Sequence, residues 1–376
     1  MDQSPTLQSH PNPIQRTRLW LDCDTGHDDA FALLLSIYHP HLDLIGCSTV
    51  HGNAPLTHTT WNTLSILTAV GSPDIPVYPG AEKPLKRSAV HAPNYHGETG
   101  LDGTQFLPEP VGLAMEGHTA VKGMRNAVME GNGVWLIATG ALTNIAELVV
   151  KHPEVVGKIE GLSIMGGCVG DGFTGANLGG KEKRGNWTEW AEFNIYCDPE
   201  AAAIVFGNEE LAKKTTLVTL DLSHQVLATE QVREKLLKSE FDKGMEKPQT
   251  QLARDLRPLF NDLLCFFAAT YRKYSGLVEG PPLHDPIAVA AVLSQAELTI
   301  DDKGGERWDV RVVTEGEHSD DPKKRGQVGR TVVTRKQEGE AGVRIPRGMD
   351  VQHFWQLIHD ALTSAESQLL GHQQAA

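Results

Sequence analysis

The sequence predicts an α/β fold in which a mostly parallel central sheet carries helices on both faces. Two observations predict it. Short runs of almost wholly apolar residues recur along the chain, and amphipathic segments with helical spacing separate one run from the next. Strands that are apolar on both faces are typical of parallel sheets covered by crossover helices.

The expected strands and helices follow one another in a regular order. The strands are predicted at residues 18–23, 42–50, 75–78, 134–138, 159–165 and 217–222. The helices are expected to begin near Asp28, Thr57, His118, Thr143, Pro199 and Thr229. Each strand is therefore followed by a helix, as in a chain of βαβ units.

A long helix over residues 250–274, in which Pro258 favours a bend, precedes a strand-rich C-terminal part. Strands are expected there at 308–314, 329–334 and 343–346, with charged, exposed connections at 320–325 and 336–340 and a last helix from about Asp350. We predict a single domain over residues 18–368, of which 301–347 is the strand-rich part. Residues 1–17 and 369–376 are expected to be disordered.

Composition excludes several classes of protein. The formal net charge of −14 and the pI near 5.6 argue against a nucleic acid or an anionic membrane as the partner. No apolar run approaches the roughly twenty residues of a membrane span, and the first residues lack the apolar stretch of a secretory signal. The five cysteines (23, 47, 168, 197 and 265) include no Cys-x-x-Cys pair, which favours reduced thiols and a cytoplasmic location.

Residues 19–30 contain four carboxylates at a predicted turn from strand to helix. Asp22, Asp24, Asp28 and Asp29 lie within eight residues, and Gly26 marks a sharp turn between them. Like charges packed this closely are unfavourable unless a cation binds among them. Capping of the helix accounts for Asp28 and Asp29 at most, so a site for a hard metal ion is the favoured interpretation.

The types of residue narrow the choice of ion. Oxygen ligands without nearby His or Cys pairs suit Ca²⁺ or Mg²⁺ rather than zinc, and Gly26 and Leu33 exclude an EF-hand loop. A rival hypothesis is a HAD-like, aspartate-nucleophile phosphatase, whose first strand also ends in two alternate Asp residues, as Asp22 and Asp24 do here. Those phosphatases carry Thr or Val at the position of Gly26, so this hypothesis is the weaker one.

Polar residues gather where the predicted strands end. Ligands of open α/β sheets bind beyond the carboxyl ends of the strands, so polar residues at that edge point to a shared site. They are Asn53 after the second strand, Thr139 after the fourth, Asn186, Glu192 and Asn194 after a glycine-rich excursion that follows the fifth, and His284 with Asp285 before a later helix. Taken one at a time, several of these residues could be turn or helix-cap residues. Because all of them follow strands at the same edge of the sheet, one shared binding site is the favoured interpretation.

In this order the fragments resemble the inosine–uridine-preferring nucleoside hydrolases from about residue 19 to residue 290. The most specific fragment is Asp22-x-Asp24-x-Gly26-x-Asp28-Asp29, and Gly52-Asn53, residues 96–101, residues 191–194 and His284-Asp285-Pro286 follow it. Thr25 stands where many members have Pro, and the excursion over residues 168–184 looks longer than the family's loop. The resemblance implies the open, Rossmann-like nucleoside hydrolase fold.

The resemblance also implies an activity: hydrolysis of the N-glycosidic bond of a ribonucleoside, such as inosine or uridine, with Ca²⁺ as the cofactor. Asp24, Asp29, Asp285 and the carbonyl of Thr139 would bind the ion, with little demand on the Thr139 side chain. Asp24 would accept a proton from the ion-bound water. Asp28, Asn53, Asn186, Glu192 and Asn194 would bind the sugar, and His284 and His96 would protonate the departing base.

Several alternatives stay open on the sequence alone. A non-catalytic calcium- or nucleoside-binding protein would share these ligands but would not need Asp24 as a base. The choice between purine and pyrimidine depends on pocket walls expected at 91–103 and 271–282, where Tyr271 and Tyr274 could stack on the base or belong to the core. The family forms homodimers and homotetramers, with a small-molecule ribonucleoside as the partner. No role is predicted for His27, His51 or His224.

Overall fold

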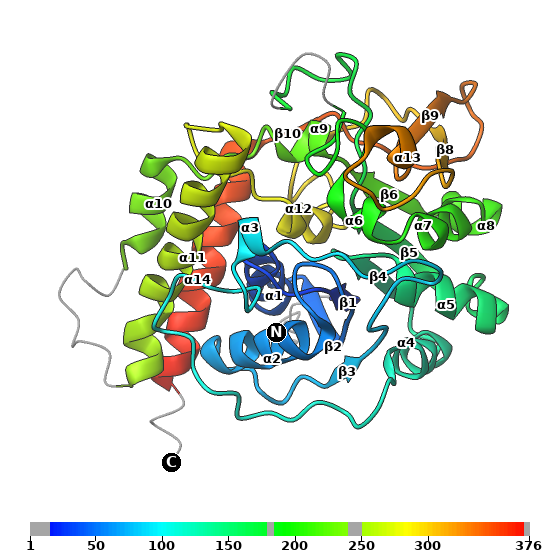
Figure 1. Cartoon of the computed structure of the whole chain (residues 1–376). Coiled ribbons are helices and arrows are strands. Elements are labelled where there is room, and N and C mark those ends of the chain that lie inside the picture. Colours follow the sequence, from blue (N-terminus) through cyan, green and yellow to red (C-terminus); the bar gives the residue numbers. More distant parts are fainter. Residues whose placement is uncertain (1–15, 179–183, 240–249, 372–376) are drawn as a thin grey trace, which may run out of the picture.

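The computed structural model describes residues 16–178, 184–239 and 250–371 of the chain. Six parallel strands form the central sheet of these residues, in the order β3-β2-β1-β4-β5-β6 (Figure 1). They are β1 (Thr17–Cys23), β2 (Leu42–Thr49), β3 (Val77–Pro79), β4 (Val134–Ala138), β5 (Ile159–Met165) and β6 (Thr215–Val218). The predicted α/β fold with a parallel sheet is confirmed.

Helices cover both faces of this sheet, because alternate residues of each strand point to opposite sides. Leu19 and Leu21 of β1 belong to the core on one face, whereas Trp20 belongs to the core on the other. The first core includes α1 (Asp29–Tyr38), α2 (Leu56–Ala69), α11 (Gln251–Ser275), α12 (Asp285–Ala290) and α14 (Val351–Gly371). The second includes α4 (Ala120–Met129), α5 (Thr143–Lys151) and α7 (Pro199–Phe206).

Short helices sit in the connections. They are α3 (Pro93–His96), the 3₁₀ turn η1 (Pro153–Val155), α6 (Phe193–Cys197), α8 (Glu209–Ala212), α9 (Leu220–Ser223) and α10 (Glu230–Leu237). The strand expected at 217–222 is wrong in its second half, because the chain turns into α9 after Val218. An apolar run of this length fits a strand or a buried helical turn equally well by its pattern.

The C-terminal part contains small antiparallel pairs. Strand β7 (Ile300–Asp301) pairs with β10 (Gly348–Met349), and β8 (Trp308–Val312) pairs with β9 (Thr331–Arg335). The connection from β8 to β9 includes the short helix α13 (Pro322–Arg325), which lies in the charged segment predicted at 320–325. The strand expected at 343–346 is reduced to isolated bridges, at Val343 to Trp308 and at Arg344 to Thr216.

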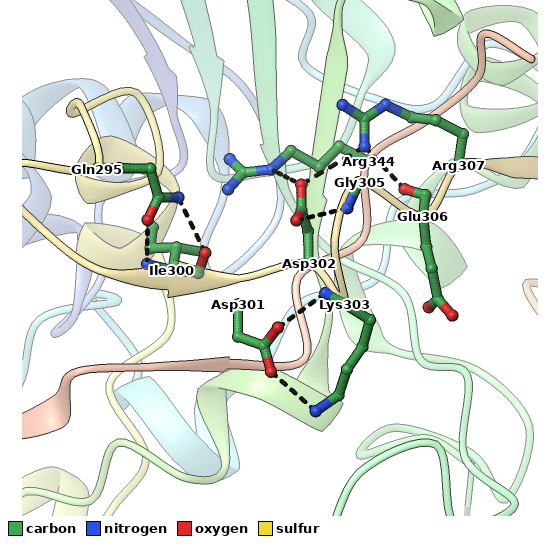
Figure 2. Close-up of polar contacts among 9 residues, drawn as sticks. All are labelled: Gln295, Ile300, Asp301, Asp302, Lys303, Gly305, Glu306, Arg307 and Arg344. Atoms are coloured by element: carbon green, nitrogen blue, oxygen red, sulfur yellow. Dashed lines mark hydrogen bonds and ion pairs between the residues drawn. The ribbon is translucent and has the colours of Figure 1, made fainter. Parts of the chain in front are cut away.

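The turn between β7 and β8 attaches this part to the central sheet. Asp302 accepts hydrogen bonds from Nε of Arg344 at 3.1 Å and from the backbone N–H of Gly305 at 2.9 Å (Figure 2). The backbone of Arg344 in turn pairs with β6, donating to the carbonyl of Thr215 at 2.9 Å and accepting from Leu217 at 2.8 Å. The strand-rich part therefore contacts an edge strand of the sheet, and its inclusion in a single domain stays a prediction.

The end of the chain differs from the expectation of a disordered tail from residue 369. Residues 369–371 are the last turn of α14, and Leu369 is buried against the turn at Gly71. The remaining tail residues, 372–376, and most of the expected N-terminal extension, residues 1–15, lie outside the described residues. Among the described helices, none combines the length and apolar character that crossing a bilayer demands.

Candidate active site

Most of the predicted site residues line one pocket at the carboxyl ends of the strands, although Asp24 and Asp29 are not part of its lining. Thr139 follows β4 directly, and Met165 is the last residue of β5. Later segments close the pocket, with α3, α6, α11 and the start of α12 each contributing side chains. The pocket is lined by Asp28, Asn53, Ala92, Tyr95, His96, Thr139, Met165, Asn186, Trp187, Glu192, Phe193, Asn194, Phe267, Tyr271, His284 and Asp285.

Three carboxylates form a buried cluster at this pocket. Oxygen atoms of Asp28, Asp29 and Asp285 all lie within 4.8 Å of one another. Burial and the neighbouring Asp29 raise the pKa of Asp28 to about 7. Burial, and then Asp28, Asp29 and Asp24, raise the pKa of Asp285 well above its usual range. Negative charge on all three of these neighbouring buried carboxylates is unfavourable unless a proton or a cation neutralises it.

Asp24 stands beside this cluster in a tightly closed position. Its Oδ2 accepts the backbone N–H of Asn53 at 2.7 Å, whereas its Oδ1 is buried and has no hydrogen-bond partner among the described residues. A Cβ atom on Gly52 would lie 1.9 Å from Oδ2, and one on Gly140 would lie 2.9 Å from Oδ1. Both glycines are therefore needed for the close approach of backbone to carboxylate. Burial, and then Asp29, raise the pKa of Asp24 well above its usual range.

These donors fit a hard divalent cation. The ligand atoms are carboxylate and carbonyl oxygens, which Ca²⁺ and Mg²⁺ prefer. In the described part of the chain, no lysine or arginine forms an ion pair with Asp24, Asp28, Asp29 or Asp285. The partnerless Oδ1 of Asp24 and the close approach of the three carboxylates fit an oxygen site for a cation, since unpaired buried charge is otherwise costly.

Thr139 contributes through its backbone and through its side chain. Its carbonyl oxygen accepts a hydrogen bond from Nδ2 of Asn194 at 2.7 Å. Its hydroxyl donates to Oδ1 of Asp29 at 2.7 Å, while the backbone N–H of Gly26 donates to Oδ2 of Asp29 at 2.8 Å. The Thr139 hydroxyl thus helps to orient Asp29, a contact that the expectation of little demand on this side chain did not include.

Polar side chains of the segment around α6 also line the pocket. Glu192 caps this helix: its carboxylate accepts the N–H groups of Asn194 at 2.8 Å and Ile195 at 3.0 Å, and that of Gly167 at 3.0 Å. Oδ1 of Asn186 accepts the N–H of Phe193 at 3.0 Å. These bonds hold a buried carboxylate and the amide of Asn194 against the pocket, although the sequence showed no helix here.

His284 and Tyr271 form a connected pair at the side of the pocket. Nε2 of His284 lies 2.8 Å from the hydroxyl of Tyr271, and Nδ1 lies 2.7 Å from the hydroxyl of Ser223. Burial lowers the pKa of His284 well below its usual range. Burial raises the pKa of the Tyr271 phenol well above its usual range. Of the two tyrosines considered on sequence, Tyr271 lines the pocket, whereas Tyr274 is 42% exposed.

The segment 168–184, which precedes Asn186, is held by hydrogen bonds or an ion pair near both of its ends. The carboxylate of Asp221 in α9 accepts the N–H groups of Val169 at 2.7 Å and Gly170 at 2.9 Å. Further on, Arg184 forms an ion pair with Asp171. Residues 179–183 of the excursion lie outside the described residues.

Asp22, the nucleophile of the rival phosphatase hypothesis, is held by structural contacts. Its Oδ1 accepts hydrogen bonds from Ser48 at 2.5 Å and from Asn144 at 2.8 Å. Burial raises its pKa to about 7, and the pocket lining does not include it. Asp22 therefore connects β1 to Ser48 and Asn144, and this arrangement gives no support to the phosphatase hypothesis.

Comparison with known proteins agrees with this site. A sequence model of the family "Inosine-uridine preferring nucleoside hydrolase" matches residues 19–356. The chain is 35% identical over 363 residues to a uridine nucleosidase of Saccharomyces cerevisiae, covering 94% of this chain and 98% of that protein. It is 39% identical over 347 residues to a pyrimidine-specific ribonucleoside hydrolase, RihA, of Photobacterium profundum, covering 92% and 98%.

Solved structures share the fold. A purine-preferring ribonucleoside hydrolase from Gardnerella vaginalis superimposes with a TM-score of 0.75 at 24% identity, covering 94% of this chain and all of that one. The family match spans nearly the whole chain and includes every residue of the pocket. The protein belongs to the inosine-uridine preferring nucleoside hydrolase family.

Proposed function

We propose that this protein hydrolyses the N-glycosidic bond of pyrimidine ribonucleosides, with uridine as the first candidate, to ribose and the free base. One observation carries the proposal: a buried carboxylate cluster and the His284–Tyr271 pair border the same pocket, which amide side chains also line. Water activation and protonation of the leaving base can therefore act on one bound substrate. The relatives that are 35–39% identical are named for uridine or for pyrimidine ribonucleosides, which supports the choice of base.

We further propose that Ca²⁺ is the cofactor. Asp24, Asp29 and Asp285, with the carbonyl of Thr139 and with Asp28 beside them, would hold it. When bound, the cation supplies Lewis acidity that makes a water molecule more acidic and orients the ribose hydroxyls.

Asp24 is the proposed general base. Its Oδ2 is held by the backbone N–H of Asn53, and the partnerless Oδ1 has a free lone pair for the proton of the attacking water. As the bond from C1′ to the base nitrogen breaks, the oxygen of the water forms the new bond to C1′ and its proton goes to Asp24.

The sugar carries positive charge as the base departs, as in O-glycoside hydrolysis. We assign its stabilisation to Glu192, Asn194, Asn53 and Asn186. The carboxylate of Glu192 is held by three N–H groups, so it is already oriented before the reaction. Preorganised dipoles and charges of this kind need no rearrangement in the transition state.

We assign protonation of the base to His284 together with Tyr271. The ring of His284 is held from Nδ1 by Ser223, and its Nε2 contacts the phenol oxygen of Tyr271, which itself lines the pocket. The proton path to the departing base therefore includes both side chains. Assembly into a homodimer or homotetramer and a cytoplasmic location stay predictions.

Steady-state kinetics on a panel of nucleosides tests the proposal, with detection of the reducing sugar. Uridine should be turned over, inosine more slowly, and 2′-deoxyuridine very poorly, because the loss of a hydroxyl leaves polar groups of the site unpaired. Asp24→Asn should be inactive on all of them. Binding of nucleosides without any turnover would instead identify a binding protein, and comparable kcat/KM for uridine and 2′-deoxyuridine would contradict the sugar contacts.

A further inference from the structure

Aromatic rings from two helices lie together at the pocket. They belong to Tyr95 of α3 and to Phe267 and Tyr271 of α11, and all three side chains line the pocket. The ring centre of Tyr271 lies 5.1 Å from that of Tyr95 and 4.8 Å from that of Phe267. Rings at such distances pack against one another as one apolar surface, which we call the aromatic group. Within this group, Tyr95 takes no part in the mechanism proposed above.

The base of a bound nucleoside would lie beside the aromatic group. The hydroxyls of the sugar need oxygen and amide partners, and the carboxylate cluster with Asn53 and Asn194 offers them. The departing base needs the proton-donating pair, whose two members are joined by the 2.8 Å contact between the hydroxyl of Tyr271 and Nε2 of His284. Tyr271 belongs to both this pair and the aromatic group, so protonation brings the base against these rings. A planar base also gains from contact with aromatic rings.

Tyr95 is attached to α11 at three points. Its hydroxyl lies 3.0 Å from Oγ of Ser275, and its backbone carbonyl accepts a hydrogen bond from the hydroxyl of Thr270 at 3.2 Å. Its ring centre lies 5.8 Å from that of Tyr274. A rotation of the Tyr95 side chain would break the hydroxyl contact and the ring contacts together. The ring is therefore a fixed part of the pocket wall.

The backbone of Tyr95 is also connected to the part of the pocket that would bind the sugar. Its N–H donates to the carbonyl of Ala92 at 3.0 Å, and the N–H of Ala92 donates to the carbonyl of Asn53 at 3.2 Å. Asn53 follows β2, and its own N–H holds the carboxylate of Asp24. These bonds set the separation between the sugar-binding groups and the ring of Tyr95, which is the space available to the base.

A fixed separation limits the size of the base. A pyrimidine is a single six-membered ring, whereas a purine carries a second, fused ring and fills more space beyond C1′. A rigid apolar wall discriminates between ligands by size, because it yields little to a group that is too large. Apolar pockets distinguish ligands that differ by a single methylene group by about 10- to 200-fold, and a fused ring is a larger difference.

From this geometry we infer that Tyr95 is a specificity-determining residue: its ring closes the pocket beside the base, contacts a pyrimidine and excludes the second ring of a purine. The inference rests on the proposed function, since it requires a nucleoside whose sugar lies at the carboxylates. It assigns the choice of base to the pocket wall. The carboxylates and the proton-donating pair act on any nucleoside that this wall admits.

Steady-state kinetics of three variants on uridine and inosine test the inference. Tyr95→Leu removes the ring, so kcat/KM for inosine relative to uridine should rise about 10-fold or more. The value for uridine itself should fall about 3- to 10-fold with the lost ring contact. Tyr95→Phe keeps the ring and loses only the contact with Ser275, so it should keep the wild-type ratio. Tyr274→Leu is the matched control, because it removes a neighbouring ring that is 42% exposed and outside the pocket lining.

Binding to an inactive form provides a second readout. In Asp24→Asn, the further change Tyr95→Leu should tighten the binding of inosine relative to uridine, measured by calorimetry, by a similar factor. An unchanged ratio in Tyr95→Leu, in turnover or in binding, overturns the inference and leaves the proposed function standing. A wild type that hydrolyses inosine as well as uridine does the same, and this comparison needs no variant to fold. A wild type that hydrolyses neither nucleoside contradicts the proposed function and the inference together.

Discussion

At the scale of single residues, the site depends on groups that hold the carboxylates in place. Gly52 and Gly140 let the backbone touch Asp24 on two sides, and Thr139 and Gly26 bind the two oxygens of Asp29. Each carboxylate thus has a fixed orientation before any ligand binds. Fixed, buried and mutually repelling carboxylates are expected to bind a divalent cation tightly, because the protein has already met the cost of bringing them together.

Asp29→Ala should abolish tight Ca²⁺ binding and turnover together, because Asp29 lies in the carboxylate cluster. Isothermal titration calorimetry with CaCl₂ measures the binding. Asp22→Asn is the matched control: this neighbouring buried carboxyl is bound by Ser48 and Asn144 and should leave Ca²⁺ binding intact. One tightly bound Ca²⁺ in Asp29→Ala would be incompatible with the proposed ligand set.

His284 and Asp285 are adjacent in sequence but should respond differently to the leaving group. His284→Ala should lower kcat on uridine by a factor on the order of 10² to 10⁴, the usual contribution of a general acid. It should lower kcat little on p-nitrophenyl riboside, whose phenolate departs without a proton. Asp285→Ala should be inactive on both substrates. Equal losses on the two substrates for His284→Ala would assign this residue to binding or structure.

At the scale of elements, α11 links the core to the pocket. Leu259 and Phe260 of this helix are buried in the core, and Phe267 and Tyr271, about two and three turns later, line the pocket. The helix is held against α14 by an ion pair between Nε of Arg257 and Glu366 at 2.7 Å, with both side chains at most 4% exposed. Figure 1 shows the two helices lying along one side of the molecule.

Arg257→Met should destabilise the protein by about 3–5 kcal/mol, because it leaves the buried carboxylate of Glu366 without its partner. Arg257→Met combined with Glu366→Leu should recover most of this loss. Denaturant unfolding measures the effect, with Lys151→Met as a control that breaks an exposed pair with Glu147 and should cost less than about 1 kcal/mol. A loss in Arg257→Met no larger than in the control would show that the ion pair does not hold α11.

At the scale of the whole molecule, stability and the metal site are linked. Buried carboxylates favour the unfolded chain, in which they can ionise freely, unless a proton or a cation neutralises them. The pKa of Asp28 shows in which direction pH changes the stability. Its pKa is about 7 in the folded protein without a cation, against 3.8 as the ordinary value. Between these two values the unfolded state releases this proton and the folded state keeps it, so rising pH destabilises the metal-free protein.

Calcium should therefore stabilise the protein more at pH values above about 7 than at about 5. The gain in Tm on adding excess Ca²⁺ should grow as pH rises through this window, because at low pH the ion must displace protons from Asp28 and its neighbours. Differential scanning calorimetry of the dialysed protein, with and without CaCl₂, measures the gain, and NaCl at equal ionic strength is the control. The same gain at every pH would contradict the linkage.

The sequence by itself determined the sheet and the carboxylate motif. The strands at 134–138 and 159–165 were predicted with their observed bounds, because each is a short apolar run between turn residues. The motif from Asp22 to Asp29 points to a cation site because the charges are close along the chain itself. The local sequence was ambiguous at 217–222, where the chain turns from a strand into α9. It was also ambiguous at 369–371, where packing of Leu369 against the turn at Gly71 accompanies the helical conformation.

Only the tertiary structure decided how the site residues pair. Ser223 lies 61 positions from His284, and His27 lies 69 positions from His96. No local sequence pattern can therefore predict either contact. The role of Glu192 as a cap, the bond of the Thr139 hydroxyl to Asp29 and the exclusion of Asp22 from the pocket likewise depend on which segments meet at the sheet edge. Hydrogen-bond partners are set by distances of about 3 Å between atoms, whereas sequence patterns report only which face of an element is buried.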